Sequence, residues 1–280
     1  MASTINTNVS SLNAQRNLNA SQSSLATSMQ RLSSGLRVNS AKDDAAGLAI
    51  AERMNSQVRG MNVAIRNAND GISMSQTAEG ALSKVGDSLQ RMRELAVQSR
   101  NATNSESDKK SLNEEFSQLQ KEVTRVIGGT KFNGKAMIGA DATKMTFQIG
   151  ANTATEDTLT VSTTNLNSNA QITAVTTGVS IGSGVTAGAI GSVIDALDKA
   201  IDTVNSQRAT FGATQSRFDA IVSNLQQGVE NQSAARGRIM DADFATETAN
   251  LSRAQILQKA GTAMIAQANQ MPQQVLALLN

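Results

Sequence analysis

The sequence predicts a mainly α protein, a long coiled-coil helical rod with a short β-hairpin region and with its termini paired in an α-helical coiled coil. The first observation is spacing, because apolar residues between Ile190 and Ile239 recur at alternating steps of four and three. The second is length: such a helix of about 50 residues spans about 75 Å. A compact chain of 280 residues has a radius of gyration of only roughly 19 Å. The third is that period-two runs are confined to residues 145–161.

The composition excludes most catalytic chemistry. The chain has no Cys, His, Trp or Tyr, so it lacks a thiol nucleophile, an imidazole base and the usual ligands of a zinc site. Its 25 basic and 23 acidic residues are interspersed and give a formal net charge of +2, without the basic stripe that binds nucleic-acid backbones. The sequence therefore predicts a non-enzymatic protein with no metal site, no cofactor and no nucleic-acid partner.

The N-terminal segment, residues 1–43, is predicted as a helix followed by a connecting spoke. Ile5, Val9 and Leu12 share one helix face, and a run of Leu residues follows after a shift of phase. The abundant Asn, Ser and Gln of this segment form helices poorly on their own. The first residues lack the basic start and the apolar run of a secretory signal peptide, and no window approaches the roughly 20 apolar residues of a membrane span.

The second region, residues 44–150, is predicted to contain three helical segments and the start of the hairpin region. Apolar residues repeat at helical spacing in 54–72 and in 78–96, with a local break of phase between these segments. A shorter helix is expected over 112–126, and the stretch NSESDKK before it supplies an N-cap.

Alternating apolar residues in KMTFQIG and DTLTVST predict two strands of a hairpin joined by ANTATE. The stretch QITAVTTGVSIGSGVTAG is expected to add a weak strand or to remain a loop. Residues 151–189 are thus predicted as a short variable surface segment, and residues 190–240 as one return helix.

The C-terminal segment, residues 241–280, ends in an apolar stripe that needs a facing helix. Its members recur at steps of three and four: Leu257, Gly261, Met264, Ala268, Met271, Val275 and Leu278. A soluble protein rarely leaves such a stripe open, so it is expected to face residues 5–36 of the same chain, of neighbouring chains, or of both. We define the assembly seam as Ile5, Val9, Leu12, Leu257, Met264, Met271, Val275 and Leu278.

Two short patterns suggest other chemistry, and each has a simpler interpretation. Gly182, Gly184 and Ala187 match a dinucleotide-binding fingerprint, but the long helices around them lack the βαβ alternation of such a fold. Acidic pairs at positions 43–44 and 241–243 are conceivable metal ligands, but each lies beside a predicted helix start, where carboxylates cap free N–H groups. A flexible turn and helix capping are therefore favoured.

Four long stretches closely resemble bacterial flagellins, and they occur in the order of that family. They are INTNVSSLNAQRNL near the N-terminus, RLSSGLRVNSAKDDAAGLAIAERM at 31–54, TKFNGKAM at 130–137 and the whole of 238–280. The resemblance covers about 1–150 and 190–280. It departs from many flagellins at 150–190, where about 40 residues are too few for large outer domains.

The resemblance implies a subunit that self-assembles into the helical flagellar filament used for motility. It also implies export in an unfolded state through the flagellar type III apparatus and polymerisation at the filament tip. The expected partners are other copies of the chain, an export chaperone, and the cap and hook-junction proteins. The expected location is secreted, in the extracellular filament, with the 1–43 and 241–280 segments forming an inner tube and the 44–150 and 190–240 segments an outer tube.

The resemblance further implies recognition by innate immune receptors of hosts. The positions that contact Toll-like receptor 5 fall on Arg91, Leu95 and Glu115, and the segment sensed by NAIP-type receptors falls on residues 275–279. From the residues alone, LQRMRELAVQS is an ordinary solvated helix face with local ion pairs, on which Leu95 lies beside the apolar stripe and is expected to be exposed. The rival interpretations are a hook–filament junction protein, an NAD-binding enzyme and a generic coiled-coil scaffold.

Overall fold

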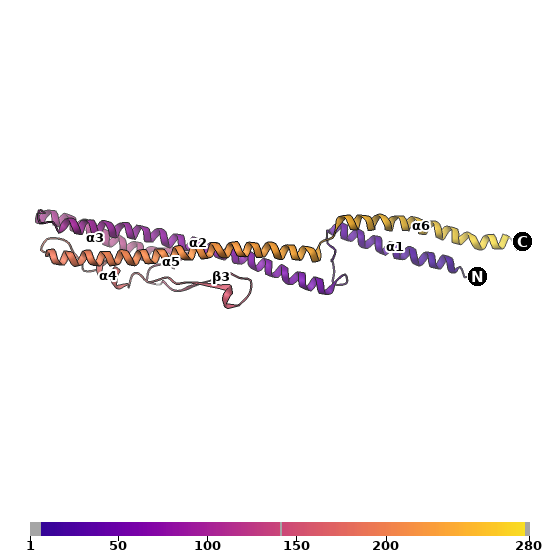
Figure 1. Ribbon diagram of the computed structural model, residues 1–280, viewed down its shortest axis with the longest axis horizontal. Coiled ribbons are helices and arrows are strands. Elements are labelled where there is room, and N and C mark those ends of the chain that lie inside the picture. The colour runs from indigo at the N-terminus through magenta and orange to yellow at the C-terminus, as the bar shows by residue number, and fades with distance from the viewer. Residues whose placement is uncertain (1–6, 141, 278–280) are drawn as a thin grey trace. The chain divides into compact units, whose positions relative to one another are not determined.

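The computed structural model describes residues 7–140 and 142–277. The chain folds into two units. The terminal unit contains residues 1–56 and 231–280, and the central unit contains residues 57–230. Helices dominate both units, and the predicted mainly α fold with paired terminal helices and a short hairpin is confirmed (Figure 1).

Two helices, α1 (Val9–Ser34) and α6 (Phe244–Ala277), form most of the terminal unit and lie side by side in Figure 1. Asn8 caps α1, since its side-chain oxygen accepts a hydrogen bond from the Ser11 amide at 3.0 Å. Gly35 ends the helix at φ +72°, a left-handed conformation that costs glycine little because it has no Cβ. Local sequence therefore sets both ends of a helix whose interior has weak propensity.

A short backbone bridge joins the segments that lead out of α1 and into α6. Leu36 and Asp241 form an isolated antiparallel bridge, and the Arg37 amide donates to the Met240 carbonyl oxygen at 2.7 Å. A small apolar cluster lies beside this bridge and contains Val38, Ala51 and Met240.

The central unit is built on three helices, α2 (Ala45–Ser99), α3 (Glu106–Gly129) and α5 (Ala187–Met240), of which α2 and α5 also contribute one end each to the terminal unit. The break of phase expected between residues 72 and 78 does not interrupt α2. The apolar stripes of the three helices meet in one core, which includes Ala78, Leu82, Val85, Leu89, Met92, Phe116, Val123, Leu197, Val204, Phe211 and Phe218.

The start of α3 is fixed by a capping box. The Ser105 hydroxyl accepts a hydrogen bond from the Asp108 amide at 3.2 Å, and the Asp108 carboxylate accepts one from the Ser105 amide at 3.0 Å. This confirms the N-cap expected within NSESDKK.

Two small hairpins follow α3. The predicted one is confirmed: β3 (Met145–Gln148) pairs antiparallel with β4 (Thr158–Val161), and the connection contains a 3-10 turn, η1 (Thr155–Asp157). The other joins β1 (Lys131–Phe132) to β2 (Lys135–Ala136) through a tight turn. In that turn both central residues have positive φ, 47° at Asn133 and 78° at Gly134, the conformation for which Asn-Gly is preferred.

The expectation of a weak strand or a loop after the hairpin is wrong at one place, because a short helix, α4 (Ala170–Thr176), forms there. Ile172 and Val175 lie three residues apart, so one helical turn buries both against the core. The buried Gln120 amide then donates to the carbonyl oxygens of Val175 at 2.9 Å and of Val179 at 3.1 Å. Burial of two side chains and two hydrogen bonds from α3 outweigh the β propensity of this stretch.

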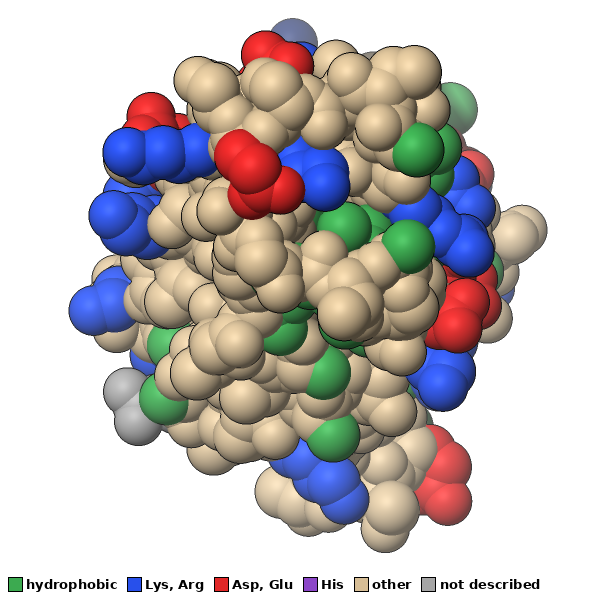
Figure 2. Space-filling view, turned by 90° about the vertical axis from the view of Figure 1, so that its left-hand side faces the viewer, with side chains coloured by type: hydrophobic (Ala, Val, Ile, Leu, Met, Phe, Trp, Pro, Cys, Tyr) green, Lys and Arg blue, Asp and Glu red, His purple; other side chains and the backbone are tan. Residues whose placement is uncertain are grey.

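The surface is mixed in charge. On the face shown in Figure 2, basic and acidic side chains lie close to one another around the rim and no single sign forms a large patch. Within the described ranges, no helix has an apolar stretch long enough to span a lipid bilayer.

Candidate functional site

The two terminal helices pair in antiparallel fashion along a narrow stripe. At one end Arg31 of α1 bonds Glu247 of α6, and at the other the Ser11 hydroxyl donates to the Asn269 side-chain oxygen at 2.8 Å. The buried and half-buried positions between these contacts form what we call the pairing stripe. It comprises Ser11, Ala14, Leu18, Ser21, Leu25, Ser28 and Leu32 of α1, with Glu247, Leu251, Ala254, Gln258, Gly261, Ile265 and Ala268 of α6.

The helices approach closely because many positions of the pairing stripe are small. A Cβ atom added at Gly261 would lie 3.3 Å from Cδ1 of Leu18, which is tighter than ordinary van der Waals contact. Leu18 thus packs directly over the backbone of α6.

The described assembly-seam residues lie outside the pairing stripe. Val9 and Met264 are each 64% exposed, and Leu12 and Leu257 are each 51% exposed. Of the three partners that the sequence leaves open for this seam (the same chain, neighbouring chains, or both), these four side chains do not use the facing helix of the same chain. Each is a large apolar group facing outward from a helix pair that is already formed.

The sequence pattern is ambiguous by one residue, which explains this result. Positions 257 and 264 neighbour positions 258 and 265, and one residue turns a helix by about 100°. Both stripes pass through Gly261 and Ala268, and the observed pairing uses Gln258 and Ile265 rather than Leu257 and Met264. Ile5 and Leu278 lie outside the described residues, as do the side chains of Met271 and Val275.

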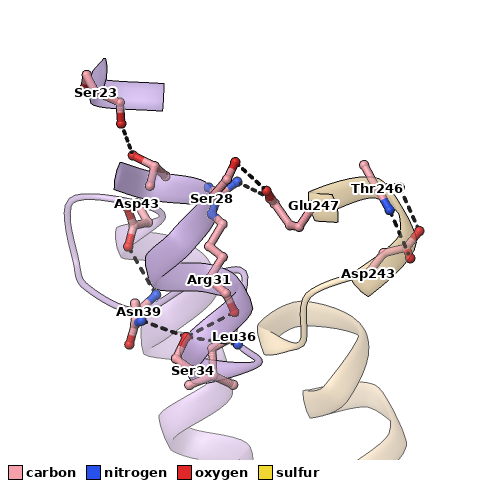
Figure 3. A network of polar contacts seen from close by, with 11 residues as sticks. Ser23, Ser28, Arg31, Ser34, Leu36, Asn39, Asp43, Asp243, Thr246 and Glu247 are labelled. Atoms are coloured by element: carbon pink, nitrogen blue, oxygen red, sulfur yellow. Dashed lines mark hydrogen bonds and ion pairs between the residues drawn. The ribbon is translucent and has the colours of Figure 1, made fainter. Parts of the chain in front are cut away.

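One end of the pairing stripe is polar. The Ser28 hydroxyl donates to Oε2 of Glu247 and the Arg31 guanidinium donates to Oε1, both at 2.9 Å, and the three side chains point toward one another in Figure 3. Glu247 is only 6% exposed. The Arg31 guanidinium, aided by the Ser28 hydroxyl, holds the pKa of this carboxyl below its usual range. A buried carboxylate is thereby kept ionised and paired.

A groove of ≈ 750 Å³ adjoins this polar end, between α1 and α6. Its walls are mostly hydroxyl and amide side chains of α1, with Arg253 and Leu257 contributed by α6. The lining therefore includes one assembly-seam residue, Leu257, together with both members of the Arg31–Glu247 contact.

Sequence reasoning missed the contribution of Glu247. The sequence contains an indication of this role, because Glu247 falls seven residues before Ala254 and thus occupies a position of the small-residue repeat of α6. An acidic residue on an apolar stripe calls for a basic partner, and Arg31 lies one position from Leu32 on the facing stripe.

The acidic pairs act as caps and turn formers, as expected of helix starts. Asp44 accepts a hydrogen bond from the Gly47 amide at 2.7 Å in the first turn of α2. Asp243 accepts from the Thr246 hydroxyl at 2.8 Å and the Ala245 amide at 2.9 Å, and these bonds lower its pKa. No group of three or more acidic residues positioned to hold a metal ion occurs among the described residues.

The fingerprint at Gly182 and Gly184 has the wrong surroundings for a dinucleotide. No strand precedes it, since the segment after α4 is irregular, and Gly182 packs against Asn113, whose side chain would lie 3.1 Å from an added Cβ. Asn113 also accepts a hydrogen bond from the Ile181 amide at 2.9 Å. The glycines therefore form a turn that is packed against α3, with φ +80° at Gly184.

The predicted receptor positions are partly brought together. Arg91 on α2 bonds Glu115 on α3 at 2.8 Å and Glu94 at 2.9 Å, and the bond to Glu115 raises the pKa of the guanidinium. Both Arg91 and Glu115 keep about half of their side chains exposed. The expectation that Leu95 is exposed is wrong, because its side chain is fully buried in the core. A position beside a two-helix stripe becomes buried once a third helix covers it.

Comparison with known proteins places this geometry in a family. Residues 5–143 match the bacterial flagellin N-terminal helical region and residues 194–279 match the bacterial flagellin C-terminal helical region. The chain is 43% identical to a flagellin of Halalkalibacterium halodurans, over 98% of this chain and 99% of that one. It is 44% identical to a flagellin of Xenorhabdus nematophila over the full length of both.

Solved structures of flagellar proteins are similar to this chain. The crystal structure of Bacillus cereus flagellin is similar with a TM-score of 0.50 and 30% identity, over 61% of this chain and 94% of that one. A putative flagellar hook-associated protein from Vibrio parahaemolyticus shares the fold alone, with a TM-score of 0.58 and 12% identity over 71% of this chain and 100% of that one. Helical regions at both ends and full-length relatives at more than 40% identity show that the chain belongs to the bacterial flagellin family.

Proposed function

We propose that this flagellin is a structural subunit of the bacterial flagellar filament used for motility, and that it polymerises through the assembly seam. The observation that supports this mechanism is the exposure of Val9, Leu12, Leu257 and Met264 on helices that are already paired with each other. Burial of the part of one such side chain that is still exposed, about half of it or slightly more, stabilises a contact by roughly 1–2 kcal/mol. Neighbouring copies of the chain are the partners that cover all four.

The polymer grows as an open fibre. The two helices place different side chains on the surface, Val9 and Leu12 on α1 and Leu257 and Met264 on α6. A contact between unlike faces is heterologous, and when the rotation does not close, it generates a helical filament.

The test is electron microscopy of the purified chain after salting out in the presence of short filament seeds. Long helical filaments are expected from the full chain, and none from a version that lacks residues 257–280. A full chain that stays soluble beside seeds of its own kind would favour a hook–filament junction protein or a coiled-coil scaffold.

Export and location follow from the same proposal. The chain is exported unfolded through the flagellar type III apparatus, accompanied by a chaperone, and is added at the filament tip beneath the cap protein, beyond the hook-junction proteins. The absence of Cys from the chain suits passage from a reducing to an oxidising compartment. The filament is extracellular, with residues 1–43 and 241–280 in the inner tube.

We also propose that Toll-like receptor 5 binds the surface around Arg91 and Glu115. The ion pair between these residues presents a half-exposed guanidinium on the α2–α3 face, a group favoured in interface contacts. Leu95 supports that face from beneath, since its side chain is buried. Recognition by NAIP-type receptors is proposed for Val275, Leu276, Leu278 and Leu279 on sequence resemblance alone.

A further inference from the structure

We propose that the polar contacts at the two ends of the pairing stripe set the register in which α1 and α6 pair, because the apolar part of the stripe repeats every seven residues and does not specify one register by itself. The main contact is that of Arg31 and Ser28 with Glu247. The inference concerns the chain itself, and only its consequence for assembly rests on the proposed function.

The apolar part of the stripe is periodic on both helices. On α1 a Leu recurs every seven residues, at Leu18, Leu25 and Leu32, with Ser21 and Ser28 between these positions. On α6 a small residue recurs with the same period, and its members are Ala254, Gly261 and Ala268. The contact of Leu18 with Gly261 shows that the large residues of α1 face the small residues of α6.

A shift of one helix by seven residues restores this pattern. After such a shift Leu18 faces Ala254 or Ala268 instead of Gly261, so a Leu again meets a small residue. The displacement along the axis is about 10 Å. Packing between large and small side chains therefore distinguishes the registers only weakly.

The polar contacts do distinguish them. Glu247 occupies a small-residue position of the α6 repeat and is nine-tenths buried. A seven-residue shift removes Glu247 from Arg31, either against Leu25 or past the end of α1. In the first case a buried carboxylate loses its cation, and in the second the Arg31 guanidinium loses its anion. Loss of the cation is strongly destabilising for the buried Glu247 carboxylate, as a single buried polar group fixes register in coiled coils. The penalty is smaller for the opposite shift, because the Arg31 side chain is 31% exposed and its guanidinium is partly hydrated.

The opposite end of the stripe supplies a second such contact. The Asn8 side-chain amide donates to the Ala268 carbonyl oxygen at 2.7 Å, and the Ser11 hydroxyl donates to the Asn269 side chain at 2.8 Å. The Ser11 contact is lost in a shifted register, since it requires the Asn269 side chain. The Asn8 contact is made to a backbone oxygen, which every register presents, and therefore does not distinguish the registers.

The backbone bridge between Leu36 and Asp241 is the alternative explanation for the register of α1 and α6. It ties the ends of both helices near the Arg31–Glu247 contact, and a strong tether there holds the register whatever the side chains are. The two causes separate experimentally, because side-chain substitutions at 31 and 247 leave the backbone hydrogen bonds of the bridge in place.

Register matters for the proposed assembly because the seam residues sit on different helices. A shift of about 10 Å moves Leu257 and Met264 relative to Val9 and Leu12 by roughly the spacing of two helical turns. A neighbour that fits one register then meets displaced apolar groups in the other.

The test detects the register by disulfide bonds introduced between α1 and α6. Such bonds can be assigned without ambiguity because the chain has no cysteine of its own. The variant Leu18→Cys/Gly261→Cys reports the observed register, since Cβ of Leu18 lies 3.7 Å from a Cβ built at Gly261, within the usual span of a disulfide. The variants Leu18→Cys/Ala254→Cys and Leu18→Cys/Ala268→Cys report the two shifted registers. Each is oxidised at high dilution, and the intrachain product is quantified on a non-reducing gel and by mass spectrometry.

In the otherwise unchanged chain, only the 18/261 pair is expected to form an intrachain disulfide readily. With Arg31→Ala/Glu247→Ala added, the ratio of shifted to observed disulfide is expected to rise by roughly tenfold or more, because both charge-assisted hydrogen bonds to Glu247 are lost. The matched control, Glu122→Ala/Arg125→Ala, removes an exposed ion pair of α3 and leaves the ratio unchanged.

An unchanged ratio in the Arg31→Ala/Glu247→Ala background, with Ser11→Ala added to remove the side-chain contact at the other end, shows that the backbone bridge sets the register and overturns the proposal. Failure of the 18/261 pair to cross-link in the unchanged chain overturns it as well, because the helices are then not held in the observed register. Neither result depends on filament growth, which is scored separately, so failure of this inference is distinct from failure of the proposed function.

Discussion

Arg31 and Glu247 lie 216 residues apart in the sequence and form an ion pair of 2.9 Å that joins the first helix of the chain to the last. The pair is set among small apolar and hydroxyl side chains, and its carboxylate is nearly inaccessible to solvent. It is the point at which helices of weak individual propensity are held to one another by side-chain charge.

The lowered pKa of Glu247 predicts loss of helix pairing in acid. A carboxyl whose folded pKa lies below its unfolded value of about 4.3 stabilises the folded state above that value, and the contribution is lost as pH falls through the folded pKa. The charged group that acts on it is Arg31 of α1, and the Ser28 hydroxyl and the Asn250 side chain are its neutral hydrogen-bond partners. Thermal unfolding followed by circular dichroism from pH 7 downward is expected to show a falling Tm for the terminal unit below about pH 5.

The variant Glu247→Gln is the control for this titration, since it keeps the shape of the side chain and cannot ionise. Its Tm is expected to be lower at pH 7 and to fall less between pH 5 and 3. Equal slopes for the two proteins would show that other carboxyls cause the acid effect.

Substitution of two glycines of α2 by alanine is expected to have opposite effects on the stability of the fold. A Cβ at Gly71 would lie 2.5 Å from the ring of Phe218, and that ring also makes an edge contact with Phe147 at 5.4 Å. Gly71→Ala is therefore expected to destabilise the fold by ~1–3 kcal/mol through overpacking. Gly80 has no neighbour within 4 Å, so Gly80→Ala is expected to stabilise it by roughly 0.5–1 kcal/mol through helix propensity.

The measurement is the free energy of unfolding from urea titration, with both variants compared with the unchanged chain. A Gly71→Ala protein as stable as Gly80→Ala would contradict the close packing of α2 on α5.

Arg91 is expected to matter for receptor recognition as a surface group. Arg91→Ala removes the ion pair with Glu115, and half-maximal activation of a Toll-like receptor 5 reporter cell is expected to need roughly tenfold more protein, the loss typical of an interface hot spot. The matched control is Arg125→Ala, which removes another exposed ion pair of the same unit and should leave activation unchanged. Equal activation by the Arg91→Ala protein would place the receptor surface elsewhere.

Much of the fold could be predicted from the sequence because long heptad repeats leave few alternatives. The repeat from Ile190 onward, the N-cap of α3 and the β3–β4 hairpin are confirmed. Membership of a family of structural proteins also confirms the prediction of a non-enzymatic chain.

The structure differs from the sequence prediction where a local pattern is compatible with two arrangements and tertiary packing determines which one forms. The burial of Leu95 depends on a third helix, α3, that a two-helix stripe does not reveal. The pairing of α6 through Gln258 and Ile265 rather than through Leu257 and Met264 depends on how α1 packs on it, which the α6 pattern alone does not reveal. The helix α4 depends on burial of Ile172 and Val175, which overrides a β-type composition.

The central claim is that apolar side chains left open on the paired terminal helices drive polymerisation. The most direct measurement is seeded filament growth of the Leu257→Asp/Met264→Asp variant, followed by high-speed sedimentation and electron microscopy. The matched control is Val63→Asp/Val97→Asp, which places the same charges on valines that are 44% and 50% exposed in the central unit. The account predicts filaments from the unchanged chain and from the control, and a soluble, helical monomer from the seam variant. Filaments of normal length and yield from the seam variant would contradict it.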